Sequence, residues 1–254
     1  MRISISVNEQ ELGKAAAEKI ANALNRAIAQ KGEANLLVST GASQFTTLAE
    51  LIQKEVDWPR VTVFHLDEYV GLPETHPASF RKYLRERLAS KLPFRAVQYI
   101  SGEGNVLESV REISEEIAAH PIDVGIVGIG ENAHIAFNDP PADFFTQAAY
   151  HVVTLNDSCK RQQVGEGWFA SADEVPKQAI SMTPAQIMRC ACVVSPVPGR
   201  RKAKAVYDML AAKTPDPNVP ATLLKKHPEW TLFLDEGSVS QCDMGRACLR
   251  YDTP

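Results

Sequence analysis

Apolar segments of strand length alternate with segments of helical periodicity along most of this 254-residue chain. The expected strands are residues 3–7, 35–39, 61–66, 97–100, 122–127, 150–155, 192–196 and 230–234. Between them the spacing predicts helices at 9–30, 45–56, 77–88, 106–119, 157–169 (polar and partly helical), 183–190, 199–210 and 220–227. This alternation predicts a Rossmann-like α/β fold, a mainly parallel open sheet with helices on both faces. Because no linker or repeat interrupts the pattern, we expect one domain over residues 1–254.

Composition excludes several classes of function. Hydrophobic residues make up 44% and charged residues 23% of the chain, and the net charge is -4 without a long run of one sign. These values are typical of a globular protein and indicate neither a nucleic-acid surface nor a basic membrane patch. With no signal sequence and no spanning segment expected, the sequence predicts a cytoplasmic protein. Five cysteines without a CxxC pair predict reduced thiols rather than a disulfide frame or zinc site: Cys159, Cys190, Cys192, Cys242 and Cys248.

The stretch from Gly128 to Pro140 gathers polar side chains directly after the predicted strand 122–127. It reads Gly-Ile-Gly-Glu-Asn-Ala-His-Ile-Ala-Phe-Asn-Asp-Pro and places His134 among carboxylates and amides. Open α/β sheets bind ligands outside the carboxyl ends of their strands, so the pattern predicts a site here. The alternative is a loop whose histidine is only a hydrogen-bonded surface residue.

Small and hydroxyl residues follow the predicted strand 35–39 and precede a helix. Free N–H groups and the helix dipole at such a turn favour an anion, so the segment is a candidate phosphate site. No lysine closes it as in a P-loop, and an ordinary strand-to-helix turn is the alternative. The residues are Thr40, Gly41, Ala42 and Ser43.

Two further strand ends carry charge. Asp67 and Glu68 follow strand 61–66. Adjacent strand residues point to opposite faces, so at most one of the two carboxylates should face a crevice directly. An acidic helix cap or a solvated turn is the alternative. Residues 199–202 (Gly-Arg-Arg-Lys) begin a helix, where cations oppose the dipole unless an anion binds. Ordinary surface side chains are the alternative there.

We expect the basic face of helix 77–88 to meet solvent or a partner.

Taken together, four stretches resemble the glucosamine-6-phosphate deaminase/isomerase family. They are residues 39–43 (Ser-Thr-Gly-Ala-Ser), 64–73 (Phe-His-Leu-Asp-Glu-Tyr-Val-Gly-Leu-Pro), 128–140, and 199–203 (Gly-Arg-Arg-Lys-Ala). The related 6-phosphogluconolactonases share the fold but usually carry a Thr-Ala-Ser-Leu-Phe-Pro type sequence after the loop histidine. Here His134 is followed by Ile-Ala-Phe-Asn-Asp-Pro, which is similar to the deaminase pattern.

The resemblance implies a role for each matching residue. His134 would open the sugar ring, and Asp67 would take the proton from C2 and return it at C1. Asn132 and Asp139 would set the orientation and protonation of His134. The substrate's phosphate would be held by the segment Thr40 to Ser43 and by Lys202, with Glu68 a further substrate-contact candidate. The family implies no metal and no organic cofactor.

Several positions depart from the family pattern. Ala133 stands where glycine is usual, so the loop either avoids a glycine-only conformation or is strained. Asp139 is one methylene shorter than the usual glutamate, and Asn132 cannot add charge. The family's substrate-binding arginine is expected near residues 165–167 and has no match there. Arg161, Gln162 or Gln163 could replace it. The basic residues that some members use for allosteric activation have no match in residues 141–150.

The sequence hypothesis is therefore a deaminase that converts glucosamine 6-phosphate and water to fructose 6-phosphate and ammonia, in amino-sugar catabolism. Galactosamine 6-phosphate is the nearest alternative substrate. A 6-phosphogluconolactonase-type hydrolase is a second hypothesis, and a non-catalytic sugar-phosphate sensor is a third. The expected partner is the small-molecule substrate. The oligomeric state stays open, a homo-oligomer included.

Overall fold

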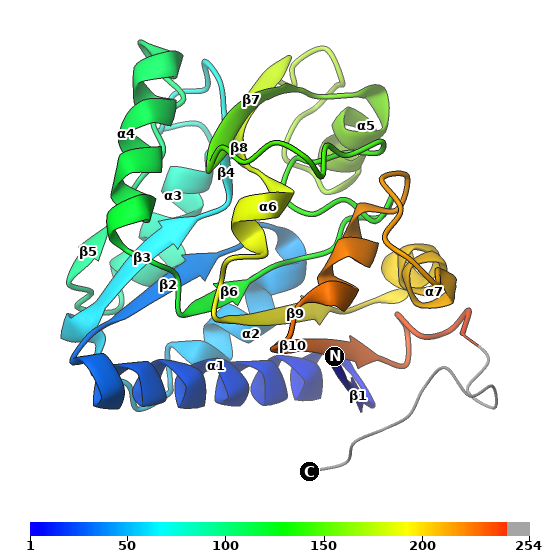
Figure 1. The fold of residues 1–254 in the computed structure, drawn as a ribbon. Coiled ribbons are helices and arrows are strands. Elements are labelled where there is room, and N and C mark those ends of the chain that lie inside the picture. The colour runs from blue at the N-terminus through cyan, green and yellow to red at the C-terminus, as the bar shows by residue number, and fades with distance from the viewer. Residues whose placement is uncertain (243–254) are drawn as a thin grey trace.

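The computed structural model describes residues 1–242, and its main feature is a parallel sheet (Figure 1). In this part of the chain the sheet has seven strands, and each pairs in parallel with its neighbours in the order β1-β10-β9-β6-β2-β3-β5. The strands are β1 (Arg2–Ser6), β2 (Ala34–Val38), β3 (Val61–His65), β5 (Ala96–Val97), β6 (Val124–Ile126), β9 (Cys192–Val197) and β10 (Trp230–Asp235). The predicted mainly parallel sheet is confirmed.

Helices cover both faces of this sheet because its strands are apolar on both sides. In β2, Leu36 and Val38 pack into one core and Leu37 into the other. Figure 1 shows α1 (Glu9–Lys31) and α2 (Phe45–Leu51) on one side of the strands. The opposite core is built with α4 (Val106–Ala119), α6 (Pro184–Ile187), α7 (Ala203–Ala211) and the 3-10 helix η5 (Pro220–Lys226).

The helix ends follow capping rules. Asn8 begins α1 by accepting a hydrogen bond from the Glu11 N–H, and Gly32 ends it in the left-handed conformation at φ 83°. Thr183 caps α6 as predicted, and Pro184 takes its first position. No helix in residues 1–242 is both long and apolar enough to cross a membrane.

A smaller antiparallel sheet stands beside the carboxyl ends of the parallel strands, and the sequence did not predict it. It has the order β4-β8-β7, with β4 (Asp67–Tyr69), β8 (Gln178–Met182) and β7 (Tyr150–Thr154). Helix α5 (Asp157–Gly165) and the aromatic rings of Tyr69, Phe80, Phe137 and Phe169 share a core with it. Strand β8 was missed because its partners lie far away in the sequence, so no local pattern marks their pairing.

The basic face expected on helix 77–88 does not lie wholly in solvent, because one of its arginines is buried. Helix α3 (Phe80–Leu84) begins after Ser79, and a π-helical turn, η3 (Arg85–Ala89), continues it. Arg81 on this helix is buried, with 6% of its surface exposed, rather than solvated. Its guanidinium instead binds Glu68 and Glu103, which compensate its charge inside the protein.

Three cysteines of the described residues carry free thiols. They are Cys159, Cys190 and Cys192, which agrees with the reduced thiols predicted at these positions. Cys248 lies outside the described residues.

Candidate active site

A central pocket lies where four neighbouring parallel strands end. Its wall includes Thr40 after β2, Asp67 after β3, His134 after β6 and Lys202 after β9. Strands β2 and β6 are adjacent, but their chain connections leave in opposite directions across the sheet. This is the switch point at which open α/β sheets bind ligands. The structure therefore brings together residues from all four sequence motifs.

Asp67 sits where the chain leaves the parallel sheet and enters the small one. Its side chain is 6% exposed, and the Thr40 hydroxyl lies 3.5 Å from its Oδ1. Burial raises the pKa of the Asp67 carboxyl well above 3.8, the charge of Glu68 raises it further, and Thr40 offsets part of the shift. Such a carboxylate is a stronger base than an exposed one and suits proton abstraction from carbon.

His65 fixes the backbone of Asp67. Its Nε2 accepts a hydrogen bond from the Ile100 N–H at 2.8 Å, which leaves the ring proton on Nδ1 to donate to the Asp67 carbonyl at 2.8 Å. Burial lowers the pKa of His65 to about 3, so the imidazole is neutral at physiological pH. His65 is therefore a positioning residue that sequence reasoning missed.

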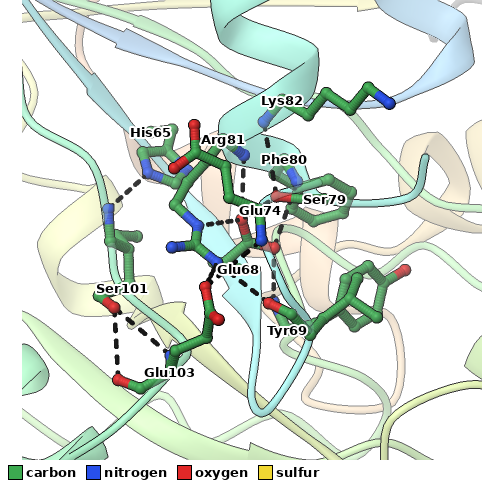
Figure 2. Close-up of polar contacts among 12 residues, drawn as sticks. His65, Glu68, Tyr69, Glu74, Ser79, Phe80, Arg81, Lys82, Ser101 and Glu103 are labelled. Carbon is green, nitrogen blue, oxygen red and sulfur yellow. Dashed lines mark hydrogen bonds and ion pairs between the residues drawn. The ribbon is translucent and has the colours of Figure 1, made fainter. Parts of the chain in front are cut away.

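Glu68 points away from the pocket, to the other face of β4. Figure 2 shows its carboxylate surrounded by the start of α3. It accepts hydrogen bonds from the Ser79 hydroxyl at 3.0 Å, the Phe80 N–H at 3.2 Å, and both the backbone N–H and Nε of Arg81 at 2.9 and 3.2 Å. Glu68 does not line the pocket, so the structure does not support it as a substrate contact. One of the two carboxylates faces the crevice, as the strand alternation predicted.

The loop after β6 holds His134 by its two polar neighbours. Asn132 Oδ1 accepts from the His134 N–H at 3.1 Å, and Asn132 Nδ2 donates to Asp139 Oδ1 at 3.0 Å. His134 Nδ1 lies 3.2 Å from the same Asp139 oxygen, close enough for an ion pair but off the line of an aligned hydrogen bond. Burial raises the pKa of Asp139, but the contacts with His134 and Asn132 outweigh it and leave that pKa lowered. Asp139 is thus an anion that can stabilise a protonated His134.

Two backbone features shape this loop. A Cβ on Gly130 would lie 2.2–2.4 Å from the atoms of the His134 ring, so only glycine admits the imidazole there. Ala133 adopts φ 66°, a left-handed conformation that costs a residue with a side chain about 1–2 kcal/mol. The expected strain at this departure from the family glycine is present. A hydrogen bond from the Ala221 N–H to the Ala133 carbonyl, at 2.9 Å, helps hold it.

One end of the pocket is formed by the segment after β2 and by Lys202. Thr40, Gly41 and Ser43 line the central pocket, whereas Ala42 lines an adjoining outer pocket that also includes Ser43, Arg200, Arg201 and Lys202. Lys202 is 7% exposed. Burial lowers the pKa of its ammonium group, and the charges of Glu166 and Glu131 offset part of that shift. A bound anion would compensate this buried cation.

The segment from α5 to Trp168 closes the pocket. Gln162 and Gln163 line it, whereas Arg161 is exposed and belongs to a separate surface pocket. Glu166 and Trp168 also line it, and neither was predicted. No local signal marked them, because a glutamate and a tryptophan in a polar segment have no characteristic spacing.

This geometry defines a class of protein: an open-sheet α/β protein whose pocket carries acid, imidazole and ammonium groups at the carboxyl ends of its central strands. The chain belongs to the family described as glucosamine-6-phosphate isomerases/6-phosphogluconolactonase, whose model matches residues 7–233. The resemblance drawn from the four motifs is confirmed.

Relatives within the family carry deaminase names. The chain is 34% identical over 243 residues to the glucosamine-6-phosphate deaminase of Bacillus cytotoxicus, covering 95% of this chain and 89% of that protein. It is 36% identical over 226 residues to the glucosamine-6-phosphate deaminase of Streptococcus equi subsp. equi, covering 89% and 94%.

Solved structures agree with the fold. A monomeric glucosamine-6-phosphate deaminase superposes with a TM-score of 0.85 at 27% identity, covering 94% of this chain and 99% of that one. The 6-phosphogluconolactonase of Trypanosoma brucei superposes with a TM-score of 0.78 at 17% identity, covering 95% and 98%, which shows the shared fold alone.

Proposed function

We propose that the protein is an isomerising deaminase that converts glucosamine 6-phosphate and water to fructose 6-phosphate and ammonia. The observation that carries the proposal is the joint placement of Asp67, His134 and Lys202 around one pocket. The deaminase names of the relatives support the choice of reaction. Galactosamine 6-phosphate is the alternative substrate, since the two sugars differ only in the configuration at C4.

The pocket supplies the groups that each step needs. His134 takes the proton from O1 and delivers one to the ring oxygen, which opens the sugar to the aldehyde; Asp139 balances the transient imidazolium. Asp67 then removes the proton from C2, which is acidic because the neighbouring carbonyl accepts the charge as an enolate. Return of that proton to C1, with O1 gaining a proton as the amino group loses one, leaves a hydroxyl at C1 and an imine at C2. Water hydrolyses the imine to the ketone and releases ammonia.

The phosphate is bound away from the reacting carbons. Lys202, Ser43 and the backbone at Gly41 line the pocket and supply positive charge and hydrogen-bond donors for it. Binding energy at this end of the substrate orients C1 and C2 toward Asp67. No residue in this scheme requires a metal or an organic cofactor.

A lactonase is the second candidate, because the fold is shared and His134 could activate water against an ester carbonyl. The two activities have different products, so one experiment separates them. Purified protein is given glucosamine 6-phosphate or 6-phosphogluconolactone, and fructose 6-phosphate and released acid are measured in parallel. The proposal expects fructose 6-phosphate from the first substrate. Acid release from the lactone without any fructose 6-phosphate would replace the deaminase by the lactonase.

A further inference from the structure

The central pocket holds one buried cation and two carboxylates, the proposed base Asp67 and a second one, Glu166. Of the residues that the structure describes, Lys202 is the one lysine or arginine in the wall of this pocket. Glu166 lines the same pocket, and both residues also line the outer pocket next to it. They therefore share the end of the pocket at which the phosphate is proposed to bind.

The Glu166 carboxylate is fixed in this place. Its Oε1 accepts a hydrogen bond from Gln162 Nε2 at 2.8 Å, and its Oε2 accepts one from Trp168 Nε1 at 3.1 Å. Trp168 itself packs edge-on against Phe45. Two donors on two different side chains hold the carboxylate against the wall, so its negative charge is preorganised before a ligand binds.

The negative charge of Glu166 stabilises the Lys202 cation and opposes a phosphate bound to it. Burial lowers the pKa of the Lys202 ammonium group, and the negative charge of Glu166 offsets this lowering more than that of Glu131 does. A phosphate dianion bound to Lys202 would meet Glu166 as a like charge, which lowers its affinity. Arg200 and Arg201 line the outer pocket and not the central one, and the Arg201 guanidinium donates to the Gly165 carbonyl oxygen at 3.4 Å. Their charges therefore offset this repulsion from the outer side, while Glu166 acts on the phosphate from within the central pocket.

We propose that Glu166 is a specificity-determining residue. It weakens binding of the phosphate dianion and so reduces the preference of the protein for phosphorylated over unphosphorylated amino sugars. The statement about substrates rests on the proposed deaminase function. The statement about phosphate binding does not, because it concerns charges that are present whatever reaction the pocket performs.

Calorimetry with inorganic phosphate tests the binding statement. Glu166→Gln removes the charge and keeps most of the shape, and it should bind phosphate roughly tenfold more tightly at low salt than the unchanged protein does. The gain should shrink as salt is added, because screening weakens the repulsion. Glu166→Ala, which removes both the charge and the hydrogen-bond acceptor, should also bind phosphate more tightly.

The matched control is Glu174→Gln, the same change at an exposed position farther along the same segment. It alters the net charge equally but lies outside the pocket, so its phosphate affinity should stay unchanged. Equal gains in the Glu174 and Glu166 variants would reduce the effect to net charge and overturn the inference. Unchanged or weaker phosphate binding by both Glu166 variants, with unaltered melting temperatures, would overturn it as well.

Turnover tests the statement about substrates. The ratio of kcat/KM for glucosamine 6-phosphate to that for glucosamine should rise roughly tenfold in Glu166→Gln. An unchanged ratio would contradict the specificity role. If the unchanged protein releases no ammonia from either sugar while Glu166→Gln still gains phosphate affinity, the proposed function fails and the role of Glu166 in phosphate binding stands.

Discussion

Asp67 and Glu68 are neighbours in the chain, and the short strand β4 turns their carboxylates to opposite faces. Asp67 lines the central pocket, and Glu68 is fully buried against Arg81 and the first turn of α3. Burial is the largest cause of the raised pKa of Asp67, and the charge of Glu68 is the next. One residue of the pair is thus the proposed base, and the other raises the pKa of that base further and connects β4 to the start of α3.

Replacing Asp67 should stop the reaction and leave ligand binding intact. Asp67→Asn keeps the size of the side chain but cannot accept the C2 proton, so ammonia release and solvent-deuterium incorporation at C1 should both disappear. Binding of a hexose 6-phosphate, measured by calorimetry, should stay nearly unchanged. Retained turnover would remove Asp67 from the role of base.

The same substitution should stabilise the protein at neutral pH. The folded-state pKa of Asp67 is raised above its ordinary value of 3.8, so the stability of the unchanged protein falls as pH rises from that value through the raised pKa. Asp67→Asn escapes this loss and should melt at a higher temperature at pH 7. Below about pH 4 the advantage should vanish, because Asp67 is then protonated in both states. An equal advantage at all pH values would contradict the electrostatic cause.

The buried ion pair behind the pocket should be costly to break. Arg81→Met leaves Glu68 charged and buried without its partner, which typically costs about 3–5 kcal/mol of the free energy of unfolding. Arg111→Met on the exposed face of α4 is the control and should change that free energy by less than about 0.5 kcal/mol. If urea denaturation gave similar losses of the free energy of unfolding for the two variants, the buried Glu68–Arg81 pair would contribute no more to stability than an exposed pair does.

Gly130 should tolerate no side chain. In Gly130→Ala the new methyl group would overlap the His134 ring, so kcat should fall at least about tenfold as the imidazole is displaced. Gly165→Ala meets nothing within 4 Å and should keep its activity. Full activity in Gly130→Ala would mean that His134 does not need the place the structure gives it.

Lys202 should act mainly on substrate binding. A charge-assisted hydrogen bond contributes about 1.5–3 kcal/mol, so Lys202→Ala should raise the KM for a phosphorylated substrate about 10- to 100-fold. Folding should change little, because the buried ammonium has no ion-pair partner in residues 1–242. Lys204→Ala, on the exposed face of α7, is the control. An unchanged KM in Lys202→Ala would place the phosphate elsewhere.

The parallel sheet and the main site motifs could be predicted from local patterns, because each buried strand and the polar turn after it are contiguous in the sequence. Thr40, Asp67, His134 and Lys202 each follow a strand of this kind. The common edge of the sheet then brings them together without further information.

The rest depends on contacts between distant segments. Strand β8 is defined by its pairing with β4 and β7, and Arg81 can be buried because Glu68 compensates its charge. Glu166 reaches the pocket through the path of the chain after α5, which no spacing rule encodes. Sequence reasoning therefore found the residues of the proposed chemistry and the two neighbours of His134, Asn132 and Asp139. It missed His65, which positions Asp67, and Glu166 in the pocket wall.

Ammonia release tests the central claim most directly. Purified protein is incubated with glucosamine 6-phosphate and, in parallel, with galactosamine 6-phosphate, and ammonia is measured in each. The account predicts ammonia and an equal amount of ketose phosphate from glucosamine 6-phosphate. No ammonia from either sugar, from folded protein that a hexose 6-phosphate still stabilises, would contradict the deaminase function and leave the lactonase or a sugar-phosphate sensor in its place.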